Sequence, residues 1–128
     1  MAVILITHDL GIVAQTAQNV AVMYAGKIVE NSKVEEIFAD PLHPYTKGLI
    51  DSLPARCEDS VDERQKYLKT IPGSVPSLYN LAAGCRFQQR CAYADGQCAE
   101  QEPPLLEINS GHCVACWKTQ TNKIGKLN

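Results

Sequence analysis

The stretch VILITHDLGIVAQTAQNVAVMYAGKIVENS, residues 3–32, decides the fold class of this chain. Its first five residues are an unbroken β-branched and aliphatic run, typical of a parallel strand buried on both faces. Apolar residues then recur at helical spacing over residues 10–17, and Asp9 stands where a helix N-cap belongs. A buried strand that leads into a helix predicts an α/β fold.

Turn and cap residues divide the remainder of residues 1–54. Two short β-type runs flank an Ala-Gly pair, which predicts a hairpin with Gly26 at a position of positive φ. Ser32 is expected to cap a short helix that ends at Asp40-Pro41. A second helix is predicted over residues 43–53, with a proline in its first turn.

The α/β piece is incomplete by itself. A strand buried on both faces needs strands beside it and helices above and below, but residues 1–54 offer one such strand and little to cover it. We therefore expect the chain to be the C-terminal part of something longer. The exposed apolar run at residues 3–6 further predicts poor solubility or self-association.

The composition is that of a folded protein and argues against several functional classes. The chain has 128 residues, of which 45% are hydrophobic and 20% charged, as in a folded domain. A formal net charge of -2 argues against nucleic-acid binding. The N-terminal run AVILI is far shorter than the roughly 20 residues that span a bilayer, and no secretory signal precedes it. We expect a cytoplasmic protein, in which six cysteines favour metal or cluster binding over disulfides.

The amino-acid composition changes along the chain. After the α/β piece, residues 55–69 are the most charged stretch and are expected to be a linker, in which Cys57 is a free thiol. Residues 70–118 are rich in proline, glycine and cysteine and are expected to form a small irregular Cys-rich module. Residues 119–128 are polar and are expected to be a flexible tail.

Four cysteines of this module form a candidate metal site. They have the spacing C-x5-C-x6-C-x17-C, which is neither the ferredoxin spacing nor the paired CxxC of most structural zinc sites. The spacing leaves zinc, an iron–sulfur cluster and free structural thiols open, with disulfides the least favoured. The four residues are Cys85, Cys91, Cys98 and Cys116.

Several motifs in this order resemble one protein family. ILITHDLGIVAQTAQNVAVMYAGKIVE resembles the switch-histidine segment of ABC-transporter ATP-binding subunits. PLHPYTKGLIDSLP resembles the His-Pro-Tyr element of the oligopeptide and dipeptide branch of that family. IPGSVPSL, GCRFQQRC and GHCVAC resemble the C-terminal extension of this branch. The resemblance covers about residues 2–117 and implies the end of an ABC ATPase domain followed by a cluster-binding module.

The resemblance implies a catalytic role for His8 in the intact protein only. As the switch histidine it would reach the γ-phosphate of ATP and help to position the attacking water. The P-loop, the signature motif and the acidic Walker-B strand of the family are absent from this chain. ATP and magnesium therefore belong to the intact protein, and the chain alone is expected to have no ATPase activity.

The resemblance also assigns the four cysteines to a four-iron, four-sulfur cluster, with zinc on the same four residues as the alternative. Arg86 and Arg90 are expected to offset the charge of the thiolates. Cys113 is expected to be a bystander, and His112 to lie beside the ligands rather than to be one. For His43 and Tyr45 we expect a structural role, in which they anchor the start of a helix and pack it on the sheet.

The function implied is that of the ATP-binding subunit of a dipeptide or oligopeptide importer. Its partners would be a second ATP-binding subunit and membrane-spanning permease subunits, on the cytoplasmic face of the inner membrane. ATP binding would close the nucleotide-binding dimer, and hydrolysis would reopen it. Two alternatives stay open: a standalone iron–sulfur or zinc-binding interaction module, and a subunit that serves an importer of nickel or another solute.

Overall fold

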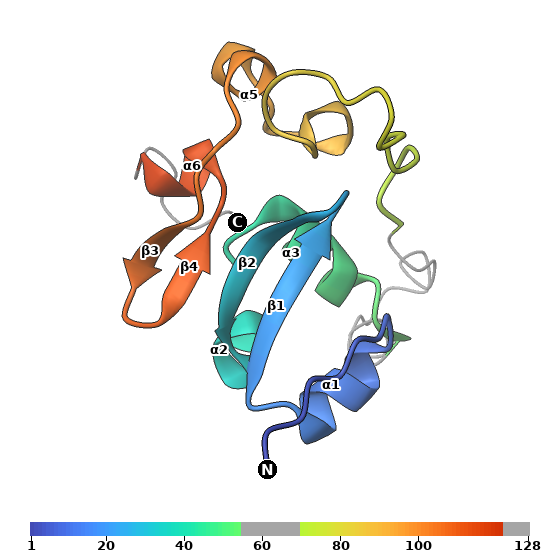
Figure 1. Ribbon diagram of the computed structural model, residues 1–128, viewed down its shortest axis with the longest axis vertical. Helices are drawn as coiled ribbons and strands as arrows, with labels where there is room; N and C mark the ends of the chain where they lie inside the picture. Colours follow the sequence, from blue (N-terminus) through green and yellow to red (C-terminus); the bar gives the residue numbers. More distant parts are fainter. Residues whose placement is uncertain (55–69, 122–128) are drawn as a thin grey trace, which may run out of the picture.

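One four-stranded antiparallel sheet, in the order β1-β2-β4-β3, connects the two halves of the chain (Figure 1). The computed structural model describes residues 1–54 and 70–121, so the predicted linker with Cys57 and most of the predicted tail lie outside the described residues. The elements, in chain order, are α1 (Leu10–Thr16), β1 (Asn19–Tyr24), β2 (Lys27–Lys33), α2 (Val34–Ala39), α3 (Pro44–Asp51), the 3-10 helix η2 (Gln88–Arg90), α5 (Gly96–Glu100), β3 (Leu106–Asn109), β4 (His112–Val114) and α6 (Trp117–Gln120).

The hairpin of β1 and β2 is the centre of the fold. The two strands pair from Asn19 opposite Lys33 to Tyr24 opposite Lys27. Gly26 has φ +80°, which confirms the predicted positive φ, and Ala25 before it also has a positive φ of 47°. Positive φ at both turn residues suits a tight hairpin, because the twist of such a turn matches the twist of the strands.

A second hairpin, β3 and β4, extends this sheet. In β4, Val114 pairs with Glu30 and Cys113 pairs with Asn31 of β2. Residues more than 80 positions apart in the sequence therefore share a ladder of hydrogen bonds, as Figure 1 shows. The sequence analysis predicted no strand in this region, because strands of three and four residues are too short to show a period.

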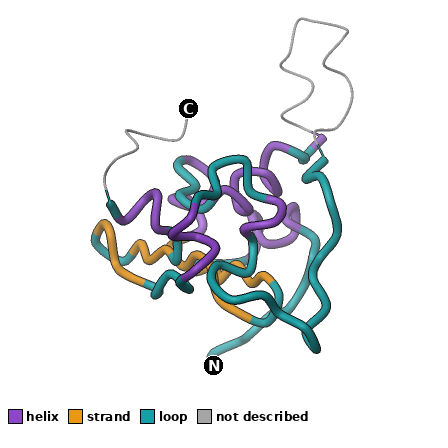
Figure 2. The backbone as a smooth tube through the Cα atoms, turned by 90° about the horizontal axis from the view of Figure 1, so that it is seen from above, coloured by secondary structure: helices purple, strands orange, loops and turns teal. Residues whose placement is uncertain are grey.

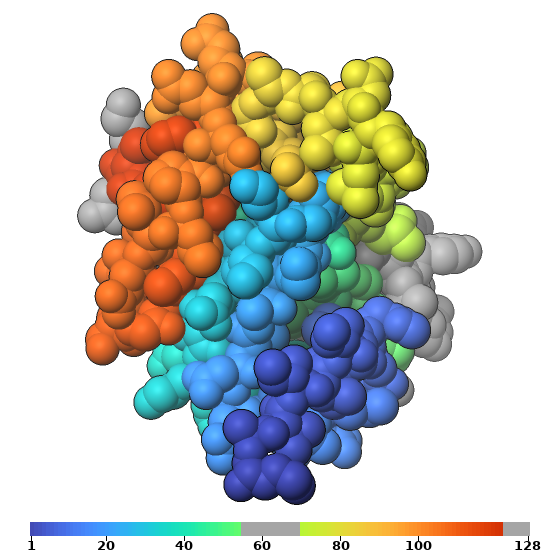
Figure 3. Space-filling view, viewed as in Figure 1, coloured from blue at the N-terminus to red at the C-terminus, as the bar shows by residue number. Residues whose placement is uncertain are grey.

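The predicted strand at residues 3–7 is wrong. These residues form no strand, and Ile4 and Ile6 are 91% and 93% exposed. A strand is held by backbone partners on its neighbours, and no described residue pairs with this segment. In the space-filling view the N-terminal residues, in dark blue, form an uncovered end of the face (Figure 3).

The first helix agrees with its prediction. Asp9 caps α1, and its Oδ1 atom accepts hydrogen bonds from the backbone N–H groups of Gly11 (2.9 Å) and Ile12 (3.1 Å). None of the residues of α1 is buried, so this helix depends on its cap more than on packing.

The two helices after the hairpin differ in how well they agree with prediction. Ser32 does not cap α2, because it belongs to β2, where it is buried and pairs with Val20. The N-cap of α2 is Lys33, which makes no side-chain cap bond. The helix ends at Ala39, with Asp40 as its C-cap, as predicted. The predicted start of α3 is confirmed, with Pro44 in the first turn.

The core lies where the hairpin meets α3 and the cysteine-bearing segment. Its buried members are Val22, Tyr24, Val29 and Phe87. Seen from above, most of the helices lie on one side of the strands (Figure 2). In residues 1–54 and 70–121, no helix has the length and apolar character needed to cross a membrane.

Candidate functional site

The four predicted metal-ligating cysteines border one small cavity. Cys85 and Cys91 flank η2, while the other two lie in α5 and at the N-cap of α6. Apolar side chains, among them Phe87 and Trp117, complete the lining. The residues that line this cysteine cavity include Cys85, Cys91, Cys98 and Cys116. None of the described cysteines is in a disulfide.

The thiols of the cysteine cavity influence one another electrostatically. Burial raises the pKa of Cys85 to about 11, although a hydrogen bond from the Phe87 backbone acts in the opposite direction. Burial also raises the pKa of Cys91 and of Cys98, and the charges of neighbouring cysteines of the cavity add to the rise. In the metal-free protein the thiols of Cys85, Cys91 and Cys98 are therefore protonated at neutral pH, and a metal would have to displace their protons.

A glycine allows two of these cysteine segments to approach. The backbone N–H of Cys85 donates to the carbonyl oxygen of Cys98 at 2.8 Å. Gly84 has φ +83°, and a Cβ atom at this position would lie 2.3 Å from that same oxygen. Only glycine fits here without a backbone shift, because real Cβ atoms do not approach an oxygen so closely.

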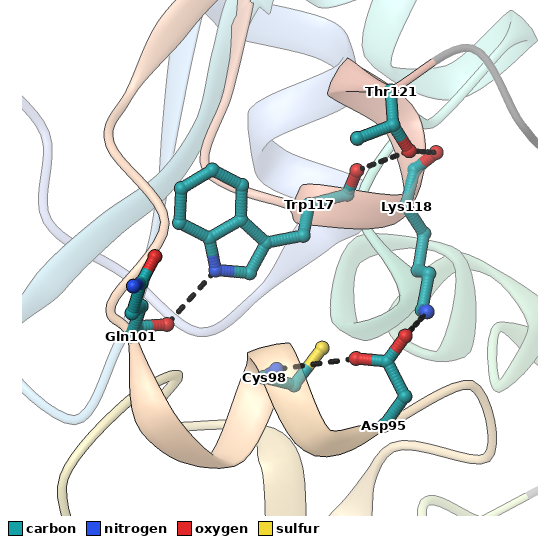
Figure 4. Close-up of polar contacts among 6 residues, drawn as sticks. All are labelled: Asp95, Cys98, Gln101, Trp117, Lys118 and Thr121. Atoms are coloured by element: carbon teal, nitrogen blue, oxygen red, sulfur yellow. Dashed lines mark hydrogen bonds and ion pairs between the residues drawn. The ribbon is translucent and has the colours of Figure 1, made fainter.

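Polar contacts tie α5 to α6 next to the cavity (Figure 4). Asp95 caps α5 by accepting a hydrogen bond from the backbone N–H of Cys98 at 3.2 Å, and its other oxygen forms an ion pair with Lys118. The indole Nε1–H of Trp117 donates to the carbonyl oxygen of Gln101 at 2.8 Å. These contacts fix the position of Cys98 relative to the segment that carries the last cysteine of the cavity.

Glu30 of β2 has a fully buried carboxylate that contacts the start of α3. Its Oε1 atom accepts hydrogen bonds from the backbone N–H of Leu42 and from Nε2 of His112, both at 2.7 Å. Its Oε2 atom accepts from the backbone N–H of His43 at 2.9 Å. The carboxylate thus joins β2, β4 and the start of α3 at one point. Sequence reasoning missed Glu30, because a glutamate in a short strand gives no signal of burial.

The prediction for His43 and Tyr45 is confirmed. Nδ1 of His43 accepts a hydrogen bond from the backbone N–H of Tyr45 at 3.0 Å and so caps α3. The Tyr45 ring packs edge-on against Tyr24, with 4.8 Å between the ring centres. His43 is 1% exposed, and burial lowers its pKa to about 4, so the ring is neutral at pH 7.

The two arginines near the cysteines bind backbone carbonyls of other segments. Arg86 donates to the carbonyl oxygen of Ala25 at the tip of the β1–β2 hairpin. Arg90 donates through Nε to Pro72 (2.9 Å) and through Nη2 to Ile71 (3.1 Å). Both side chains therefore fasten the cysteine-bearing segment to its neighbours.

The structure separates His8 from the cysteines. His8 is exposed and directly precedes Asp9, the cap of α1. In Figure 1, α1 and α5 lie at opposite ends of the molecule. Cys113, the expected bystander, lies on β4 opposite Asn31 and is not among the residues that line the cysteine cavity. Within residues 1–54 and 70–121, no three His, Cys, Asp or Glu side chains form a group that could hold a metal ion.

Comparison with known proteins gives consistent matches. Residues 29–98 match the family model described as "Oligopeptide/dipeptide transporter, C-terminal region". The chain is 52% identical over 118 residues to the probable peptide ABC transporter ATP-binding protein y4tR of Sinorhizobium fredii, covering 92% of this chain and 34% of that relative.

Two relatives from Bacillus subtilis show the same pattern. The chain is 46% identical to the oligopeptide transport ATP-binding protein AppD and 49% identical to OppD, over 116 residues in each case. These matches cover 91% of this chain, but 34% of AppD and 31% of OppD. The chain thus spans about a third of the length of the curated relatives it matches.

Proposed function

The chain belongs to the family of the oligopeptide/dipeptide transporter C-terminal region, and from this premise we propose that it serves in the ATP-binding subunit of a peptide importer. The observation that carries the proposal is the 52% identity to a probable peptide ABC transporter ATP-binding protein across 92% of this chain. AppD and OppD are named oligopeptide transport ATP-binding proteins, which favours oligopeptides over nickel as the cargo.

In the whole subunit, the binding and hydrolysis of ATP would drive the uptake of dipeptides or oligopeptides. Its partners would be a second ATP-binding subunit and membrane permease subunits, at the cytoplasmic face of the membrane. His8 would act there as the switch histidine, with its imidazole bound to a phosphate oxygen of ATP. The chain contains no GxxxxGK[ST] motif to bind phosphates, so its purified form should show no magnesium-dependent ATP hydrolysis.

A chimera tests this proposal. The matching third of Bacillus subtilis OppD would be replaced by this chain in a strain that lacks OppD, and uptake of a labelled oligopeptide would be measured. We expect the chimera to restore uptake and its His8→Ala variant to fail at the same protein level. A chimera that accumulates normally but gives no uptake would contradict the proposal.

For the cysteine cavity we propose a four-iron, four-sulfur cluster, with zinc as the alternative. The support is chemical, since the four cysteines line one cavity together with apolar side chains, and thiolates are donors that both groups prefer. The described side chains do not form a metal-binding group as they stand, so the four thiols would have to draw together around the bound centre. When bound, the cluster would supply a covalent cross-link and a one-electron redox centre. The chain's own residues position the thiols through the approach at Gly84 and the α5–α6 contacts.

Metal analysis of anaerobically prepared protein distinguishes the two centres. A cluster predicts about four irons and matching sulfide per chain with broad visible absorbance, whereas zinc predicts one colourless ion. Serine at any of the four cysteine positions of the cavity should reduce metal content. Cys113→Ser serves as the matched control and should retain it. Equal metal content in all five variants would contradict the assignment of the ligands.

A further inference from the structure

A histidine from the other half of the chain borders the cysteine cavity. His43 lies more than 40 positions before the first of the four cysteines, yet its side chain lines the same cavity. Its ring also lies against Phe87, with 5.7 Å between the ring centres. His43 is 1% exposed, so its side chain is enclosed by other protein groups.

The hydrogen bonds of His43 determine where its proton is. Nδ1 accepts from the backbone N–H of Tyr45, so this nitrogen carries a lone pair and no hydrogen. An imidazole with a bare Nδ1 has its single N–H at Nε2, which makes Nε2 a donor. The backbone N–H of the same residue is held by Glu30, which restricts the residue from a second side. Capping α3 therefore occupies Nδ1, and Nε2–H is the second polar group of a ring that lines the cysteine cavity.

We propose that His43 is a further residue of the cysteine site, whose Nε2–H donates a hydrogen bond to a thiolate or sulfide sulfur of the bound centre. The inference rests on the cluster proposed above. Hydrogen bonds to the sulfurs stabilise negative charge on a cluster, so the added electron is held more firmly and the reduction potential rises. His43 is in this sense a positioning and tuning residue, which links the start of α3 to the cysteine cavity.

Two substitutions separate this role from the capping of α3. Asparagine places an acceptor where Nδ1 stands but has no atom at Nε2, so His43→Asn keeps the cap and removes the donor. Glutamine carries its amide N–H farther along the side chain, so His43→Gln keeps a donor and weakens the cap. His8→Asn, at an exposed histidine that does not line the cavity, is the control.

The test is a reductive titration of reconstituted protein, with the urea midpoint of each variant measured alongside. We expect His43→Asn to lower the reduction potential, His43→Gln to stay closer to wild type, and His8→Asn to match it. The urea midpoint should be higher for His43→Asn, which keeps the cap of α3, than for His43→Gln, which weakens it. If His43→Asn holds the cluster at the wild-type potential, the inference is wrong and His43 only caps α3.

A second measurement needs no substitution at His43. Pulsed electron paramagnetic resonance of the reduced wild-type protein, labelled with 15N-histidine, should show a nitrogen coupled to the cluster. Absence of this coupling would overturn the inference even where the variants fold poorly. Wild-type protein that takes up no iron and sulfide would instead overturn the cluster proposal, and the His43 inference with it.

Discussion

Replacing Glu30 by glutamine tests the central polar contact of the fold. The carboxylate accepts three hydrogen bonds, from the backbone N–H groups of Leu42 and His43 and from Nε2 of His112. It is fully buried, and solvent cannot replace a lost partner. Glutamine has the same shape but turns one acceptor oxygen into an N–H₂ donor.

The expected loss follows from these contacts. A hydrogen bond to a charged group contributes roughly 1.5–3 kcal/mol, and a buried donor left without a partner costs a further 1–3 kcal/mol or so. At least one of the three donors would face the new N–H₂ group. Glu30→Gln should therefore lower the free energy of unfolding by about 3 kcal/mol or more.

Urea unfolding measures this loss directly. With a slope of roughly 1–3 kcal/mol per molar urea for a small domain, the midpoint should fall by about 1 M or more. Glu100→Gln, at an exposed position of α5, is the matched control and should stay within about 0.5 kcal/mol of wild type. Amide hydrogen exchange should accelerate at Leu42 and His43 in Glu30→Gln alone. If the two variants unfold alike, Glu30 does not stabilise the fold as argued here.

Two further predictions concern the cysteine cavity and its surroundings. Gly84→Ala should disrupt the cysteine cavity and abolish metal uptake, because the added Cβ would lie 2.3 Å from the Cys98 carbonyl oxygen. The control, Gly111→Ala, also has a positive φ but has open space around it, so its free energy of unfolding should fall by only about 1–2 kcal/mol. Similar losses of metal and stability in both variants would contradict this reasoning. Burial lowers the pKa of His43 from 6.5 to about 4, so the unfolded state of the metal-free protein binds a proton that the native state excludes. The neutral, buried His43 therefore contributes about 3 kcal/mol to the free energy of unfolding above pH 6.5, and this contribution should be lost as the pH falls to 4. The urea midpoint of His43→Asn should fall less steeply over this range.

The sequence alone determined the features that depend on neighbouring residues. The cap at Asp9, the positive φ at Gly26 and the start of α3 at Pro44 were all predicted, because each is set by hydrogen bonds or sterics within a few positions. The motifs also identified the family, and the spacing selected four cysteines that the structure places around one cavity.

Only the tertiary structure decided the features that join distant parts of the chain. The pairing of β2 with β4 and the bond between Glu30 and His112 connect residues about 80 positions apart. Residues 3–7 failed as a strand for the same reason, since an apolar run becomes a strand only beside a partner that supplies the other half of its hydrogen bonds. A local sequence pattern indicates which side chains a segment can bury and which hydrogen bonds it can donate, but only the fold determines which distant groups pack against them or accept those hydrogen bonds.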